Sequence, residues 1–307
     1  MAEITASMVK QLRESTGAGM MDAKNALTEN NGDIEAATDW LRTKGLAKAA
    51  KKSSRTAAEG LVAIATNGKT GVVVEINSET DFVARNEEFQ GFVRAVTDKA
   101  LTEAKDLDGL MSAQLDGKAV SENLTDKIAK IGENMNIRRM EKLSVNDGVV
   151  VGYMHNAVAP NLGKIGVLVA LESAGDKAKL EALGKQIAMH AAAAFPKFLT
   201  REDVDAATVE RERNVLREKA IAEGAKPEIV EKKLEGGIRK FYEDIVLLEQ
   251  VFVMDGQTKM AKLLENAAKD VGAPVALTAF SRIQLGEGIE KEEVDFAAEV
   301  AATARSA

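Results

Sequence analysis

The sequence predicts an α+β fold, and three observations point to it. Two pairs of short apolar strand-like runs are each followed by a long helical run, and the N-terminal stretch shows helical spacing throughout. A charged stretch in the third quarter of the chain has apolar residues only at intervals, as in a helical hairpin. Since 307 residues are more than one small core usually needs, several packed units are expected.

The N-terminal stretch is predicted to form three short helices, over residues 4–15, 20–29 and 33–43. Asp33 suits the N-cap of the third helix, because its carboxylate can accept hydrogen bonds from the first free amides. Gly45 lies where a helix commonly ends in a left-handed residue. A unit of this size has a marginal core, so we expect it to pack on the rest of the chain or to be presented to a partner.

Residues 47–55 are small and basic, and they are predicted to form a solvated linker. The cations are Lys48, Lys51, Lys52 and Arg55. No aromatic residue lies between them, whereas nucleic-acid sites on single strands combine cations with aromatic stacking platforms. The linker interpretation is therefore favoured over a binding patch.

The next part of the chain has strand-like composition and is predicted to be the first half of an α+β core. Runs at residues 61–66 and 71–76 are rich in β-branched residues, and Asn67-Gly68 between them is a hairpin turn signal. After residues 80–85, a helical stretch follows over residues 86–105. The order of elements is strand, strand, helix.

The same order recurs later in the chain. Strands are predicted over residues 149–154 and 165–171, and a helix over residues 179–194. Identity between the two stretches is slight. The repeated order of elements nevertheless indicates two related α+β halves.

Between the second half and its last elements, residues 203–242 are predicted to form an antiparallel helical hairpin that projects from the body. Gly224 can end its first helix, and Pro227 can open the second because a first helical turn does not need the missing amide. Beyond it we expect an apolar stretch over residues 244–254, a helix over 258–269, a strand over 275–285 and an amphipathic helix over 289–303.

The predicted division of the chain follows from these patterns. It consists of an N-terminal three-helix module and linker (1–55), a core N-terminal half (56–145), a core C-terminal half (146–202 and 243–280), the helical hairpin insertion (203–242) and a C-terminal strand end and helix module (281–307).

Composition excludes several classes of protein. A net charge of -7 opposes a dominant nucleic-acid role, since phosphate binding depends on concentrated Lys and Arg. No apolar run approaches the roughly 18 residues that a membrane helix needs, so no membrane partner is expected. The absence of cysteine removes disulfides and thiolate ligands. No secretory pattern is visible at Met1, so a cytoplasmic location is expected.

The sequence shows no recognisable set of catalytic groups. Gly68-Lys69-Thr70 resembles the end of a phosphate-binding loop, but the first glycine of that motif would have to occupy Ala63. His155 and His190 are too few for a three-histidine metal site, and neither is paired with a nucleophile at a recognisable spacing. His190 lies in an apolar run and is expected to be buried, and His155 is expected to be exposed. No catalytic residue, metal or cofactor is predicted.

Several sequence blocks resemble one protein family. Residues 79–86, which read Glu-Thr-Asp-Phe-Val-Ala-Arg-Asn, closely resemble the signature of elongation factor Ts. Further blocks similar to that family are residues 9–13, 16–24, 189–192, 252–254 and 286–291. They occur in family order along the whole chain, so the sequence is identified as a member of that family.

The resemblance implies a fold and an activity. The N-terminal module is expected to have a three-helix fold like that of ubiquitin-associated domains. The family exchanges guanine nucleotide on elongation factor Tu, which it binds in the GDP-bound and the nucleotide-free state, and some relatives form homodimers. By resemblance, Thr80, Asp81, Phe82 and Val83 act at the nucleotide-binding domain of that GTPase, with Phe82 as a wedge and Asp81 as a source of hydrogen bonds.

The same resemblance implies further contacts with the partner. They involve Lys10, Met20 and Lys24 in the N-terminal module, the region of His155, the pair Val253 and Met254, and the C-terminal helix. Without the family, Met20 and Met254 are equally well explained as core residues, Lys24 as a solvated charge, and Phe82 as a core aromatic.

Two other functions are kept as alternatives. The first is a binding adaptor that uses the N-terminal module to recognise an apolar patch, in which case residues 1–55 alone would keep most of the affinity. The second is a small-molecule enzyme with its site between the two core halves. The missing nucleophile, metal and phosphate-loop signatures count against the enzyme.

Overall fold

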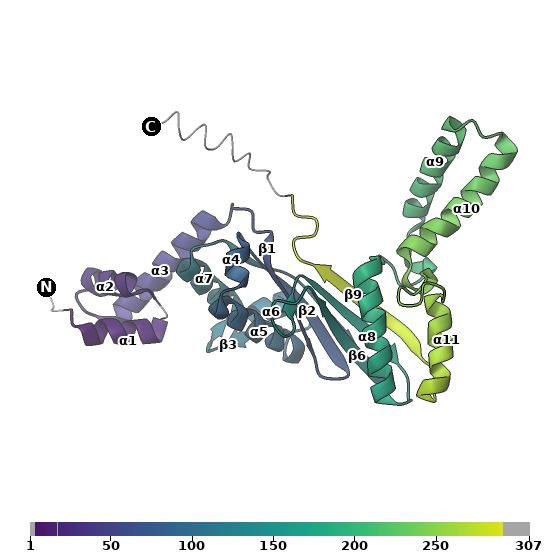
Figure 1. Ribbon diagram of the computed structural model, residues 1–307. Coiled ribbons are helices and arrows are strands. Elements are labelled where there is room, and N and C mark those ends of the chain that lie inside the picture. The colour runs from purple at the N-terminus through teal and green to yellow at the C-terminus, as the bar shows by residue number, and fades with distance from the viewer. Residues whose placement is uncertain (1–3, 17, 291–307) are drawn as a thin grey trace.

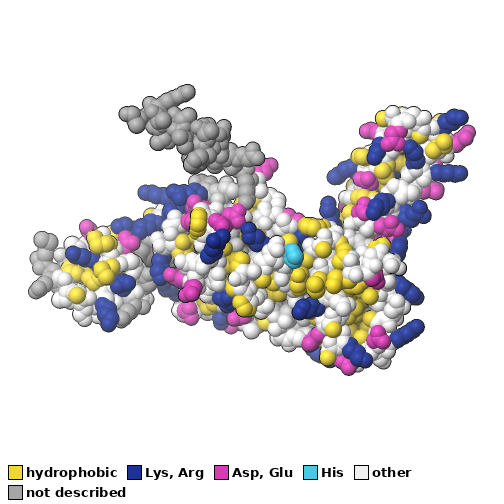
Figure 2. All heavy atoms as spheres, in the orientation of Figure 1, with side chains coloured by type: hydrophobic (Ala, Val, Ile, Leu, Met, Phe, Trp, Pro, Cys, Tyr) yellow, Lys and Arg dark blue, Asp and Glu magenta, His cyan; other side chains and the backbone are white. Residues whose placement is uncertain are grey.

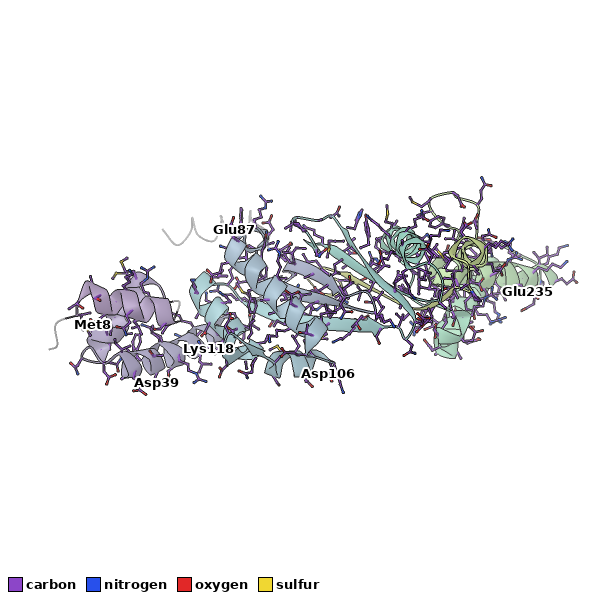
Figure 3. All side chains as sticks on the ribbon, turned by 90° about the horizontal axis from the view of Figure 1, so that it is seen from below. Met8, Asp39, Glu87, Asp106, Lys118 and Glu235 are labelled. Atoms are coloured by element: carbon purple, nitrogen blue, oxygen red, sulfur yellow. The ribbon has the colours of Figure 1, made fainter. Side chains whose placement is uncertain are left out.

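The computed structural model describes residues 4–16 and 18–290. It is an elongated α+β molecule with an N-terminal helical module at one end, the sheets of the core in the middle and a helical arm that projects at the far end (Figure 1). Seen from below, Met8 and Asp39 lie at the end opposite Glu235 of the arm (Figure 3). Among the described residues, no helix has the length and apolar composition to cross a membrane.

The N-terminal module consists of α1 (Ala6–Thr16), α2 (Met20–Glu29) and α3 (Ile34–Lys52). Its small core is formed by Leu12, Ala23, Ala26, Leu27 and Ala37. The predicted cap is confirmed, since the Asp33 carboxylate accepts hydrogen bonds from the amides of Glu35 and Ala36 at 2.9 and 3.0 Å. The three predicted helices are therefore present.

The predicted end of the third helix is wrong. α3 continues through Gly45 to Lys52, so most of the expected solvated linker is helical. Gly45 is buried, and a Cβ placed on it would lie 3.6 Å from the Cβ of Ala129 in α7 (Val120–Ile131). Helix packing against α7 outweighs the low helix propensity of glycine, because a residue without a side chain lets the two helices approach closely.

The first half of the core begins with β1 (Glu59–Thr66) and β2 (Thr70–Ser78), which pair antiparallel as predicted. The Asn67 amide donates to the Thr70 carbonyl at 2.9 Å, and Gly68 has the positive φ of +93° that this turn requires. The half then contains α4 (Asp81–Ala84), α5 (Glu87–Thr102), α6 (Leu107–Ser112), β3 (Gln114–Leu115), β4 (Lys118–Ala119), α7 and β5 (Met135–Ser144).

The second half begins with β6 (Gly148–His155) and β8 (Ile165–Glu172), which also pair antiparallel and lead into α8 (Lys177–Ala194). After the arm it contains the short 3-10 turn η2 (Leu247–Glu249), α11 (Met260–Val271) and β9 (Ala276–Gln284). The short strand β7 (Leu162–Gly163) crosses over to pair with β1 of the first half. The expected strands and the helix after them are confirmed.

The two halves repeat one backbone arrangement. In each, a third strand returns after the helices and pairs with the second strand, β5 with β2 and β9 with β8. Both pairings shift register, between Glu75 and Ile76 in one and between Ala170 and Leu171 in the other. A Cβ on Gly60 would lie 2.3 Å from the Ile76 carbonyl oxygen, and one on Gly148 would lie 1.9 Å from that of Leu171. The matching irregularities support the prediction of two related halves.

The two sheets pack face to face through one apolar layer. The buried residues of this layer come from both halves: Val62, Ile64, Val73, Val145, Val150, Leu168, Ala170 and Ile283. α5 covers the outer face of the first sheet, and α8 covers that of the second. Side chains of both halves thus fill the space between the facing strands.

The arm consists of α9 (Ala206–Ala222) and α10 (Pro227–Ile245), preceded by the 3-10 turn η1 (Arg201–Asp203). Gly224 adopts a φ of +76° between the helices, and Pro227 stands in the first turn of α10, as predicted. A narrow seam of Ala220, Val230 and Leu234 joins the helices. The amphipathic helix expected over residues 289–303 lies almost wholly outside the described residues.

Candidate partner-binding site

Phe82 is presented to solvent from the one-turn helix α4. Its side chain is 75% exposed, whereas that of Val83 is 6% exposed and belongs to the core of the first half. Asp81 is also exposed, and its carboxylate lies 3.4 Å from the Arg85 guanidinium. The segment therefore shows Asp81 and Phe82 outward and uses Val83 as an anchor, so the core interpretation of Phe82 is wrong.

Hydrogen bonds hold this segment at both ends. The amide and hydroxyl of Thr80 both donate to the Glu133 carboxylate, at 2.9 and 2.6 Å. Beyond α4, the Asn86 side chain accepts from the amides of Glu88 and Phe89 and so caps α5. The backbone that carries Phe82 is thus fixed by neighbours on either side, and Phe82 itself is left uncovered.

The N-terminal module presents a second group of candidate residues. Lys10 of α1 and Lys24 of α2 are exposed, and Met20 at the start of α2 is 61% exposed. Met21 beside it is exposed too, although the sequence did not single it out. Figure 2 shows hydrophobic side chains gathered on the visible face of this module. Exposed methionines are adaptable contact groups, because the thioether chain is flexible and polarisable.

A third group lies in the second half, where the family-like blocks at residues 189–192 and 252–254 are in contact. Phe252 is buried, while Val253 and Met254 are exposed. The amide of Val253 donates to Nδ1 of the buried His190 at 3.2 Å, and Nε2 of His190 bonds to Oε1 of Gln250 at 2.9 Å. The ring therefore carries its proton on Nε2 and positions Val253 through Nδ1.

The environment of His190 keeps the ring neutral. Burial lowers the pKa of His190, and the hydrogen bond to Gln250 opposes this shift only in part. A neutral ring is what the contact with the Val253 amide requires, because Nδ1 must accept a hydrogen bond. The prediction that His190 is buried is confirmed, and its role is to position the neighbouring segment.

His155 lies at the end of β6 and is exposed, as predicted. Its Nδ1 is 3.2 Å from the Tyr153 hydroxyl. The loop that follows presents the exposed side chain of Val158 between two left-handed asparagines, Asn156 and Asn161. His155 is thus followed in the chain by a loop with one exposed apolar side chain.

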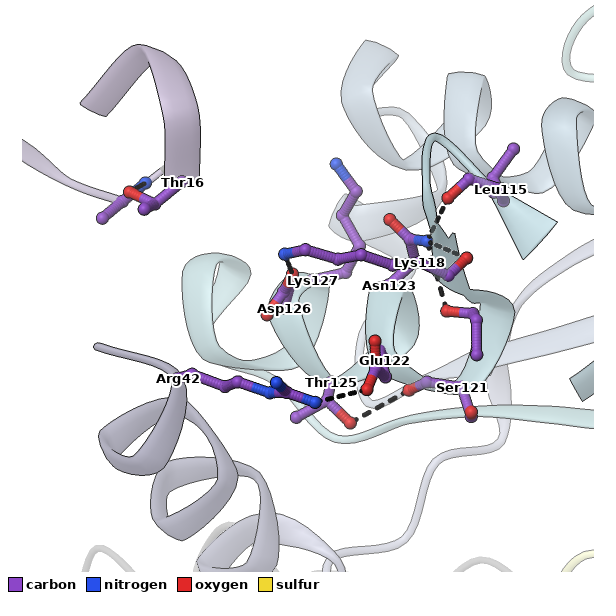
Figure 4. A network of polar contacts seen from close by, with 12 residues as sticks. Thr16, Arg42, Leu115, Lys118, Ser121, Glu122, Asn123, Thr125, Asp126 and Lys127 are labelled. Atoms are coloured by element: carbon purple, nitrogen blue, oxygen red, sulfur yellow. Dashed lines mark hydrogen bonds and ion pairs between the residues drawn. The ribbon is translucent and has the colours of Figure 1, made fainter. Parts of the chain in front are cut away.

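A cleft of about 760 Å³ lies between the N-terminal module and α7, beside the contact of α3 with α7 at Gly45. Cations and carboxylates alternate along its walls, and Arg42 of α3 bonds to Glu122 of α7 at 2.5 Å across it (Figure 4). Asn123 donates to the carbonyls of Leu115, Lys118 and Ala119 and so ties β3 and β4 to α7. The polar network holds the module beside the core. Within the described part of the chain, no group of His, Asp or Glu residues is arranged to hold a metal ion.

The candidate residues form separate groups. Residues 80–83, His155 and the pair Val253–Met254 lie on the core, and Lys10, Met20 and Lys24 lie on the module at one end of the molecule. The structure adds Glu133 and His190 as residues that support two of these groups. Glu133 is 53 residues from Thr80, so no local pattern could have revealed the pairing.

Comparison with known proteins gives one consistent result. The family model described as Elongation factor TS matches residues 79–287. A protein named Elongation factor Ts from Rhodospirillum rubrum is 62% identical over 98% of this chain and 99% of its own length. Those from Sphingopyxis alaskensis and Rhizobium etli are 60% and 55% identical over 99% of this chain, and the match covers 99% and 100% of their own lengths.

These matches first define the class, which is that of the translation elongation factors. Within this class the chain belongs to the elongation factor Ts family. Residues 80–83, with the exposed side chain of Phe82, lie inside the region that the family model matches.

Proposed function

We propose that this protein is a guanine nucleotide exchange factor for elongation factor Tu. The observation that carries the proposal is Phe82, a large apolar side chain held in solvent by a backbone that Val83 anchors in the core. Such a side chain can enter an apolar cleft at little cost in ordering, because its backbone is already fixed. Asp81 beside it offers carboxylate oxygens that can set the angle of entry.

The proposed mechanism involves no covalent step. Phe82 enters the G domain beside the nucleotide site, the phosphate- and magnesium-binding region of that domain is displaced, and GDP is released. Binding is reciprocal, so a factor that favours the nucleotide-free GTPase weakens nucleotide affinity by the same ratio. The chain binds the GDP-bound form first and the nucleotide-free form more tightly.

The energetics require more than one contact. A ten-thousandfold change in affinity corresponds to about 5.5 kcal/mol of differential binding. Burying one Phe side chain supplies about 1.5–3 kcal/mol, so Phe82 alone does not account for the differential binding. We assign the remainder to the exposed groups described above: Lys10, Met20, Lys24, His155, Val253 and Met254, together with the helix predicted over residues 289–303.

The activity is proposed to take place in the cytoplasm, where protein synthesis supplies the partner. The cysteine-free sequence suits a reducing compartment. Homodimers, which the resemblance implies for some relatives, are not needed by the proposed mechanism.

The decisive experiment measures release of fluorescent GDP from elongation factor Tu. Added in less than stoichiometric amount, the full-length protein should accelerate release, because each molecule acts repeatedly. Phe82→Ala should remove most of the acceleration. The matched control is Phe195→Ala, which truncates another exposed phenylalanine, at the C-cap of α8, and should leave the rate unchanged. Release that is no faster with the parent protein, or equally fast with Phe82→Ala, contradicts the proposal.

A further inference from the structure

Three consecutive residues after α7, Gly132, Glu133 and Asn134, contact separate parts of the molecule. We call them the 132–134 turn. Gly132 ends α7 with a φ of +89°, and Met135 directly after the turn is buried at the start of β5. The turn is therefore fixed on both sides, by a helix end and by a strand.

Glu133 fixes Thr80, which stands two residues before Phe82, the proposed wedge. Thr80 occupies the N-cap position of α4, yet its hydroxyl does not cap that helix. Both the hydroxyl and the amide of Thr80 donate instead to the Glu133 carboxylate, at 2.6 and 2.9 Å. Charge-assisted hydrogen bonds of this length are stronger than neutral ones, and two of them restrict both the backbone and the side chain of Thr80.

Asn134 fixes Glu79, the residue before Thr80. Asn134 is buried, and its backbone amide donates to Oε1 of Glu79 at 2.5 Å. Its side-chain nitrogen donates to the Arg55 carbonyl at 2.7 Å, while the Arg55 guanidinium lies 3.5 Å from Oε2 of Glu79. Residues 79 and 80 are thus both held by the same turn.

Gly132 connects this arrangement to the N-terminal module. Its carbonyl oxygen accepts a hydrogen bond from Nζ of Lys52 at the end of α3. A cation is favourable there, because the carbonyls at the end of α7 carry partial negative charge. α3 runs without interruption from the N-terminal module, which carries Met20, to Lys52. The turn therefore contacts both the helix that leads to the module and the segment that carries Phe82.

We infer that the 132–134 turn positions the wedge relative to the N-terminal module, with Glu133 and Asn134 as positioning residues for nucleotide exchange. The inference rests on the proposed function. Neither residue needs to touch the partner. Their effect is to hold α4 in one orientation before binding, so that contacts on the module and on the core are made at the same time. Loss of the restraint should therefore lower the maximal exchange rate more than the apparent affinity.

The first test compares exchange kinetics of Glu133→Gln with those of the parent. The glutamine keeps the size of the side chain but removes the charge and one of the two acceptors facing Thr80. The maximal exchange rate should fall about tenfold, as expected for the loss of a charge-assisted hydrogen bond, with the half-saturating concentration changed less than about threefold. Glu103→Gln is the matched control, since it removes one surface carboxylate at the far end of α5.

Variants of Thr80 separate positioning from general stability. The isosteric Thr80→Val loses the hydroxyl that donates to Glu133, and it should be slow. The double variant Thr80→Val/Glu133→Gln should be no slower than the slower single variant, because both changes remove one interaction. Fully additive losses, or a parent-like maximal rate in Glu133→Gln, overturn the inference.

The second test does not depend on the partner. Hydrogen exchange of the free protein should be faster at residues 79–86 in Glu133→Gln than in the parent and the Glu103→Gln control. If the parent does not accelerate GDP release, the proposed function fails, and this measurement alone decides on the turn. Unchanged protection of residues 79–86 against hydrogen exchange contradicts the positioning role, whatever the result of the GDP-release assay.

Discussion

The two halves of the core share a backbone plan but differ in the segment that connects the second strand to the next long helix. In the first half, residues 79–86 and the one-turn helix α4 separate β2 from α5. In the second half, only residues 173–176 separate β8 from α8, and Asp176 caps that helix directly. The extra turn in the first half is the part that carries Phe82. Similar scaffolds thus acquire different roles through the loops that they support.

A second difference lies at the register shift. Glu75 precedes the shift in the first half, at the position that Ala170 occupies in the second. Glu75 is fully buried and accepts hydrogen bonds from Arg138, Arg139 and the amide of Gly286. Burial raises the pKa of Glu75, but the hydrogen bonds from Gly286, Asn77 and Arg139 lower it more, so the carboxylate stays ionised. The first half therefore uses a charged cluster where the second half uses apolar packing.

The largest expected effect comes from breaking this cluster. Glu75→Ala leaves two arginines without their shared carboxylate, and it should reduce the free energy of unfolding by about 3–5 kcal/mol. Chemical denaturation followed by circular dichroism measures the change. Glu103→Ala, which breaks an exposed ion pair with Lys99, should cost no more than about 0.5 kcal/mol. Equal losses in the two variants would show that the buried cluster does not stabilise the first half.

Next in size is the effect of the two equivalent glycines. An added Cβ would meet a backbone oxygen at both Gly60 and Gly148, so Gly60→Ala and Gly148→Ala should each destabilise the protein by about 2–3 kcal/mol. Denaturant titration of both variants tests the equivalence of the halves. Gly117→Ala, at a positive φ with open space around it, separates backbone strain from the clash. A large loss at only one of the two glycines would argue against a shared plan.

The exposed groups of the two halves should differ in kinetic effect. Phe82 is proposed to act within the complex, whereas Met254, exposed on the second half, is expected to supply binding energy alone. Met254→Ala should raise the half-saturating concentration for GDP release about three- to tenfold, equivalent to about 1 kcal/mol, with the maximal rate nearly unchanged. Phe82→Ala should lower the maximal rate instead. Identical kinetic patterns would remove this distinction between the halves.

The smallest expected effect is a pH dependence in the second half. Because burial lowers the pKa of His190, the unfolded chain takes up a proton below pH 6.5, the usual value, before the folded protein does. Stability is therefore full above that pH and decreases as pH falls below it, by at most about 1.4 kcal/mol per pH unit. His190→Gln should flatten this dependence. If the dependence of stability on pH were unchanged in His190→Gln, it would arise from other groups.

The sequence predicted most elements of the molecule because their patterns are local. The cap at Asp33, the turn at Asn67-Gly68 and the helical hairpin around Gly224 and Pro227 depend on residues within one turn or one strand of each other. Strand β5 was not predicted. Its alternation is weak, because Arg138 and Arg139 lie side by side in it and bond to the buried Glu75.

The residues of the candidate site were named from the resemblance, which does not give their geometry. The resemblance pointed to Phe82, yet only the structure shows that Phe82 faces solvent while Val83 faces the core. The extension of α3 past Gly45 was missed for a similar reason, since the helix is stabilised by contact with α7, about 80 residues away in sequence.

The sequence by itself determined the class of fold, the order of most of its elements and the family, because periodicity, turn residues and motif blocks lie in consecutive residues. The tertiary structure decided which side chains are presented and what holds them. Glu133 and Thr80, or His190 and Val253, meet only when strands and helices far apart in the chain are packed together. Burial and hydrogen bonding are properties of that packing, and no single stretch of sequence contains them.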